Sequence, residues 1–269
     1  LGSSGSQGVS FSWVQCVVGL LRGQILSDKK IRILMQVIFR RASYTLSWHL
    51  RPAHLRSMRT PRSWFRLAMV NFLAAAILGL VLRLIYLVEI PFVQFRPFLH
   101  AHSHVALLGW LFIAVVVAIW DDGGGGRLDV LFRQLLFGLQ LAVVMMLFAF
   151  PLQGYGPISI AASMVHMLLA FAILYRLWQK ASDWPAKGSR GLVRWAITFF
   201  CLSNLGVMAI PIIISAGLQA NEIYYWSVQF FLHFQFNGWF WFAAMTLGAR
   251  WAERRGVRLD IDGLTMGLW

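Results

Sequence analysis

The stretch LHAHSHVALLGWLFIAVVVAIW, residues 99–120, decides the fold class of this chain. It contains no Asp, Glu, Lys or Arg. A helix of this length, rising about 1.5 Å per residue, crosses the roughly 30 Å hydrocarbon core of a bilayer. Strands of a transmembrane barrel would be shorter and would alternate in hydrophobicity. With five similar runs beside it, the stretch predicts an all-α, polytopic membrane helix bundle with six transmembrane helices. The six runs cover residues 67–88, 99–120, 134–152, 157–178, 195–216 and 226–249.

Composition places most of the chain in lipid. Of its 269 residues, 59% are hydrophobic and only 13% are charged, about half the charged share of soluble domains. The net charge of +14 is uneven, since residues 1–66 hold eleven of the 24 Lys and Arg. No nucleic-acid recognition motif accompanies this charge. We therefore expect the lipid bilayer as a partner, and no nucleic acid.

Loop charges predict the orientation. Lys and Arg gather before the first run, between the fourth and fifth, and after the sixth, whereas three other loops are nearly free of them. By the positive-inside rule both termini are cytoplasmic, in a bacterial inner membrane. The sequence from Met58, MRTPRSWFRLAMVNF, is typical of the start of a bacterial membrane protein. We thus expect a basic, poorly ordered segment over residues 1–60, of which 1–57 are dispensable, and a six-helix transmembrane domain over 61–258.

Histidines provide the candidate site. Five of them fall on the second, fourth and sixth runs, which all cross from outside to inside, and we expect them in the outer half of the bilayer: His100, His102, His104, His166 and His233. Ionisable groups at such depth face the bundle interior and have partners. His100 and His104 are four residues apart and share a helix face, while His102 points away. For His102 we expect an interhelical hydrogen bond.

Polar stripes accompany the other histidines. Ser159, Ser163 and His166 line one face of the fourth run, and a second stripe lines the sixth run at Gln229, His233 and Asn237. Neutral imidazole is a common ligand of copper, zinc and haem iron. The sequence therefore predicts metal ligands at His100, His104, His166 and His233. The alternative is that these polar groups only join helices through hydrogen bonds.

Two stretches carry a family resemblance. FRPFLHAHSHVALLGW, residues 95–110, resembles the second helix of subunit I in the haem-copper oxidase and nitric-oxide reductase superfamily, where an Arg-Pro-x-x-His element supplies a low-spin haem ligand. That element maps onto Arg96, Pro97 and His100. The chain is also similar to short bacterial proteins described as oxidase-subunit-I-like, through LHAHSHVALLGW, FPLQGYG and LHFQFNGWF.

A late helix of the superfamily has a matching pattern. FLHFQFNGWFWF, residues 231–242, resembles its His-x-His-Phe element, with His233 at the first histidine and Gln235 at the second. The resemblance implies haem ligation by His100 and His233. Arg83 and Arg96 lie at the outer edge of the predicted helices and are candidates to pair with the propionates; the alternative for Arg83 is snorkelling to the membrane interface. The chain departs from the oxidases in several ways. It has six predicted helices, and only five histidines lie in them. It also has no paired histidines for copper and no tyrosine beside a ligand histidine. The resemblance thus implies the scaffold and one haem or metal, without full oxygen-reductase activity.

These observations lead to one prediction and two alternatives. The prediction is a membrane haem- or copper-binding protein of the electron-transfer or respiratory-chain type, acting with an electron donor or other respiratory subunits. One alternative is a copper or zinc transporter or sensor that uses the same histidines. The other is a non-catalytic structural subunit of a membrane complex. The sequence leaves open which metal is bound and whether any reaction is catalysed.

Overall fold

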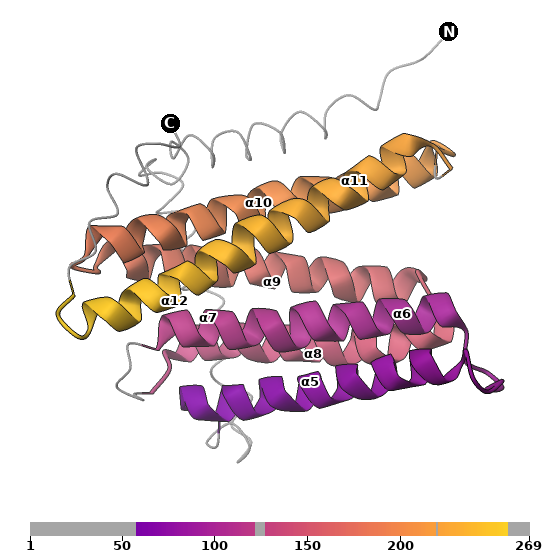
Figure 1. Ribbon diagram of the computed structural model, residues 1–269, viewed down its shortest axis with the longest axis horizontal. Coiled ribbons are helices and arrows are strands. Elements are labelled where there is room, and N and C mark those ends of the chain that lie inside the picture. The colour runs from indigo at the N-terminus through magenta and orange to yellow at the C-terminus, as the bar shows by residue number, and fades with distance from the viewer. Residues whose placement is uncertain (1–57, 122–126, 219, 258–269) are drawn as a thin grey trace, which may run out of the picture. The chain divides into compact units, whose positions relative to one another are not determined.

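The computed structural model describes residues 58–121, 127–218 and 220–257, and this part of the chain is all-α (Figure 1). The segment predicted as poorly ordered lies outside the described residues apart from 58–60. The helices are α5 (Pro61–Leu84), α6 (Phe95–His104), α7 (Ile113–Trp120), α8 (Val130–Gln153), α9 (Pro157–Ser182), α10 (Lys187–Ser215), α11 (Glu222–His233) and α12 (Trp241–Glu253). Two π-helical segments, η1 (Val105–Phe112) and η2 (Phe234–Phe240), join α6 to α7 and α11 to α12. The described residues therefore form six helical runs, each near its predicted position.

Five of the runs are long and apolar enough to cross a membrane: Pro61–Leu84, Phe95–Trp120, Val130–Gln153, Pro157–Ser182 and Lys187–Ile214. The sixth, over residues 222–253, is not among these five. Its middle carries Gln229, His233, Gln235 and Asn237, which make it more polar than the others. The chain is thus a multi-pass helical protein with five candidate spans.

Local sequence sets where several helices begin. Pro61 and Pro157 occupy first-turn positions, where the missing N–H costs nothing and the fixed φ suits a helix. Asp129 caps α8, because its carboxylate accepts from the backbone N–H groups of Leu131 and Phe132. Asn221 caps α11 in the same way through the N–H of Ile223.

The described residues divide into two compact units. The larger holds the described residues within 58–194 and 240–257, and the smaller holds those within 195–239. In the larger unit α5 packs against α6 and η1, and α8 packs against α6 and α9 (Figure 1). The core between these helices contains Ala75, Leu78, Ala101, Val105, Val143, Met146, Phe150 and Ala162.

One polar cluster ties three helices of the larger unit together. The Asn71 amide on α5 donates to the carbonyl oxygen of Gly109 on η1 at 2.8 Å and to Gln140 Oε1 on α8 at 2.8 Å. Gln140 Nε2 returns a bond to Asn71 Oδ1 at 3.0 Å. Gly109 allows this approach, since a Cβ there would lie 2.6 Å from Val143 Cγ1 and 3.2 Å from Asn71 Nδ2. The helices therefore meet at one fixed register.

In the smaller unit α10 and α11 also meet through a glycine. A Cβ on Gly206 would lie 2.6 Å from the backbone oxygen of Ser227. Further along, the hydroxyl of Ser203 donates to Gln235 Oε1 at 2.9 Å, and both side chains are buried. Gln235, a buried polar residue of η2, thus has a hydrogen-bond partner, Ser203, on α10.

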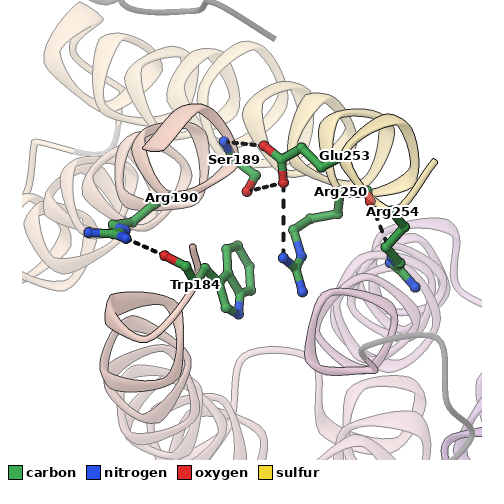
Figure 2. Close-up of polar contacts among 6 residues, drawn as sticks. All are labelled: Trp184, Ser189, Arg190, Arg250, Glu253 and Arg254. Atoms are coloured by element: carbon green, nitrogen blue, oxygen red, sulfur yellow. Dashed lines mark hydrogen bonds and ion pairs between the residues drawn. The ribbon is translucent and has the colours of Figure 1, made fainter. Parts of the chain in front are cut away.

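A second polar cluster joins the ends of α10 and α12 in the larger unit (Figure 2). The Glu253 carboxylate accepts from the backbone N–H of Ser189 at 3.1 Å and from its hydroxyl at 2.7 Å. Arg250 lies 4.0 Å from Glu253 and 4.2 Å above the ring of Trp184. Arg190 donates to the Trp184 carbonyl oxygen. Glu253 thus provides the first turn of α10 with an anionic acceptor, as the helix dipole favours.

A double-mutant cycle tests the Asn71–Gln140 pair. Asn71→Leu and Gln140→Leu should each lower the free energy of unfolding in detergent, because each leaves one amide buried in apolar surroundings. The double variant should lose less than the sum, by a coupling energy of about 0.5–2 kcal/mol. Strictly additive losses would contradict the pairing.

Glu253→Ala should lower the unfolding free energy by about 1–3 kcal/mol, since it removes a charged acceptor from two donors. Thermal unfolding in detergent would measure the effect. Arg254→Ala is the matched control, because Arg254 is exposed and only its side-chain bond to Arg250 would be lost. Equal effects of the two substitutions would show that Glu253 has no special part in joining the helices.

Candidate histidine site

His104 is the best-defined candidate ligand in the larger unit. Its Nδ1 lies 2.9 Å from the carbonyl oxygen of His100, one turn earlier on α6. A carbonyl oxygen only accepts, so Nδ1 carries the hydrogen and Nε2 keeps a free lone pair for a ligand bond. Metal-binding histidines commonly orient themselves in this way. The helix backbone therefore sets both the tautomer and the direction of the His104 ring.

Aromatic rings cover the same face of α6. The ring of Phe150, near the end of α8, lies 4.4 Å from that of His104. The Tyr155 ring meets the His100 ring edge-on at 4.5 Å. A tyrosine thus lies beside a candidate histidine, although the sequence around the histidines shows none. Tyr155 is far from His100 in sequence, and only the turn between α8 and α9 brings it there.

That turn explains the FPLQGYG element. Gly154 has φ +60°, a conformation that favours glycine, and ends α8. A Cβ on Gly156 would lie 2.6 Å from the Gln153 side chain. With its amide oxygen turned toward α9, Gln153 accepts from the N–H groups of Ile158 and Ser159. The Ser159 hydroxyl contacts the carbonyl oxygens of Gly154 and Gly156. The turn is therefore fixed by its own polar groups.

His166 lies on the neighbouring helix of the larger unit. It belongs to α9, is only 2% exposed, and meets the Phe112 ring edge-on at 5.8 Å. Its Nε2 is buried and has no hydrogen-bond partner among the residues that the structure describes. Burying an imidazole nitrogen without a hydrogen-bond partner costs its solvation free energy. This cost is offset if the nitrogen binds a metal ion or another bound group.

His102 has the interhelical role predicted for it. Its Nδ1 lies 2.8 Å from the carbonyl oxygen of Ala75 on α5. Its ring also fits against Gly79, where a Cβ would lie 3.1 Å from His102 Cε1. The small residue and the carbonyl, one turn apart on α5, together form a seat for the ring. His102 therefore joins α5 to α6.

His233 lies in the smaller unit. It is exposed, and its Nδ1 is 3.3 Å from Asn237 Nδ2. The polar stripe predicted on this run is thus present, yet it is not the face that packs on α10, which carries Gln235 and Trp239 instead. The packed face of α11 is set instead by Gly206 on α10, which lies against the backbone of Ser227 and Phe231.

The two π-helical segments follow a shared pattern. Each begins at the residue after a candidate histidine, His104 or His233. Each contains a Gly-Trp pair at the same distance from that histidine, Gly109-Trp110 in η1 and Gly238-Trp239 in η2. π-helical turns are rare and frequently occur at functional sites.

The remaining predicted site residues lie on exposed surface. Arg83 lies in the last turn of α5 and Arg96 in the first turn of α6, and both are exposed. Within residues 58–121, 127–218 and 220–257, no three His, Cys, Asp or Glu side chains come together as a possible metal site. Pairing of His100 with His233 concerns different units, so it stays a prediction.

No family model, curated protein or solved structure matches this chain. Fold and composition therefore define only a broad class: an all-α multi-pass membrane protein with five candidate spans in its described part.

Gly79→Val should lower the melting temperature in detergent, because its side chain would displace the His102 ring from Ala75. Gly248→Val is the control, since Gly248 lies within a helix of the same unit and a Cβ there meets nothing within 4 Å. If both variants melted alike, the seat proposed for His102 would be wrong.

Proposed function

We propose that this protein binds a haem or a copper ion in its membrane domain and serves electron transfer or a respiratory chain. The observation that carries the proposal is the buried, unpartnered Nε2 of His166 in the same unit as His104. His104 presents an Nε2 lone pair because its Nδ1 is held by a backbone carbonyl. Two such imidazoles in apolar surroundings suit copper, zinc or haem iron.

The residues divide between the two kinds of cofactor. A copper ion would draw on His100, His104, His166 and His233, and would supply one-electron chemistry. A haem would draw on His100 and His233, as the resemblance implies, with Arg83 and Arg96 toward its propionates. Phe150 and Tyr155 would exclude water beside either group, because their rings already cover His104 and His100.

The proposal includes a topology. The run over residues 222–253 would be a sixth transmembrane helix, and its polar residues would be tolerated if they face protein, a cofactor or a water-filled cavity. Lys and Arg positions favour cytoplasmic termini in a bacterial inner membrane. An electron donor or other respiratory subunits would be the partners.

A copper or zinc transporter or sensor is the second candidate. Interrupted helices often mark transport sites, and Pro151 and Pro211 lie inside α8 and α10. Each proline removes one backbone hydrogen bond and frees a carbonyl within an apolar helix. A structural subunit without a cofactor is the third possibility, which the following experiment separates from the other two.

Metal analysis and absorption spectroscopy of the purified protein test the proposal. We expect copper or a haem Soret band in the unaltered protein. For a metal ion, His104→Ala and His166→Ala should each lower the stoichiometry because each removes a ligand, whereas His102→Ala should retain it. For haem, His100→Ala or His233→Ala should abolish the Soret band.

His102→Ala is the matched control, because His102 lies on the same helix but its ring is occupied by α5. Zinc alone, lost on the same substitutions, would favour the transporter or sensor. Protein without metal or haem after expression with both supplied would contradict the proposal and favour the structural subunit.

A further inference from the structure

Met146 lies in the core of the larger unit, on the helix that packs against those carrying His104 and His166. It belongs to α8 and is fully buried. It shares its apolar cluster with Val105, the residue after His104, and with Ala162, which is four residues before His166. Three helical segments, η1, α8 and α9, thus contribute to the surroundings of one thioether.

Two contacts fix its level in the bundle. Phe150, one turn after Met146 on α8, has its ring 4.4 Å from that of His104. Ser163, three residues before His166 on α9, has its hydroxyl 3.3 Å from Met146 Sδ. Because α8 and α9 are joined by a tight turn and run in opposite directions, the sulfur lies between the levels of His104 and His166, about a turn from each.

The sulfur remains available as a donor. The Ser163 hydroxyl has one hydrogen, and the Ser159 carbonyl oxygen, at 2.8 Å, is a stronger acceptor than a thioether. This back-bond is the usual one for a serine within a helix. The contact with Ser163 therefore positions Met146 Sδ without occupying its lone pairs.

The donor set has a definite chemical preference. In the described spans of the larger unit no carboxylate or thiol accompanies the histidines, and Cys201 belongs to the smaller unit. Hard cations such as calcium and magnesium need oxygen ligands. Thioether sulfur is soft and favours Cu(I), while imidazole alone is bound well by several metals.

We propose that Met146 is a third ligand beside His104 and His166, and that it makes this site selective for Cu(I). This inference rests on the proposed function, since it assigns a metal to the same histidines. It goes further by naming the oxidation state and by giving a core methionine a role besides packing. Met is often a mere gap-filler in cores, and the experiment must separate the two roles.

Competition titration with a colorimetric Cu(I) chelator measures the affinity directly. The full chain in detergent, kept reduced and anaerobic, would be titrated with Cu(I), and in parallel with Zn(II). Met146→Leu should weaken Cu(I) binding by at least about tenfold, as even the loss of a ligand's supporting partner commonly does. Zn(II) affinity should change less than about twofold, because zinc gains little from a thioether.

Met145→Leu is the matched control. Met145 is the preceding residue, is 42% exposed, and undergoes the same change of side chain. Met146→Leu nearly conserves volume, so both variants should fold, and thermal unfolding would verify this. Copper X-ray absorption gives a second readout: sulfur scattering should be present in the unaltered protein and absent in Met146→Leu.

The outcomes separate the two proposals. If His104→Ala and His166→Ala weaken Cu(I) binding but Met146→Leu behaves like Met145→Leu, the inference is overturned and the proposed function stands. If neither histidine substitution affects Cu(I) or Zn(II), both are overturned. Equal weakening of Cu(I) and Zn(II) by Met146→Leu would show a packing effect and would also overturn the inference.

Discussion

A polar group inside an apolar bundle must find a partner, and the cluster of Asn71, Gln140 and Gly109 meets this requirement with one arrangement. The two amides exchange hydrogen bonds, and the second hydrogen of Asn71 reaches a backbone oxygen on a third segment. A shift of any helix by a turn would leave amides unsatisfied where water is scarce. Apolar contacts alone tolerate many registers, so this cluster is what makes the packing of α5, η1 and α8 specific.

The candidate site inherits its geometry from that register. Gly109 lies in the π-helical segment that begins directly after His104, and the Asn71 bond fixes this segment against α5. About two helical turns before Gly109, His102 contacts Ala75 and Gly79 on α5. With α6 held on that side, His104 is directed toward α8, where Phe150 meets its ring. The short turn after α8 then brings α9, and with it His166, to the same unit.

Hydropathy and residue spacing predicted the helical runs and the separate role of His102. Apolar runs of membrane length are specified residue by residue, so the six helical runs and the separation of His102 from its neighbours follow from sequence. Tertiary contacts do not follow in this way. Tyr155 meets His100 only because Gly154 and Gly156 permit a tight turn, and the seat of His102 depends on Gly79. The exposed position of His233 reflects the face of α11 that meets Gly206 on α10, which the spacing of polar residues does not indicate. The close helix contacts at Gly79 and Gly109 are indicated in the sequence by a lone glycine in an apolar helix. The glycine does not indicate which residue packs against it.

The central claim is that imidazoles of the membrane domain hold a metal ion or a haem. Electron paramagnetic resonance of the purified, oxidised protein, after supply of copper and haem, tests it most directly. The account predicts either a Cu(II) spectrum with hyperfine coupling to imidazole nitrogens, reduced in His166→Ala, or a low-spin ferric spectrum typical of two axial histidines. A copper spectrum without nitrogen coupling, or one unchanged in His104→Ala and His166→Ala together with no ferric signal, would contradict the account.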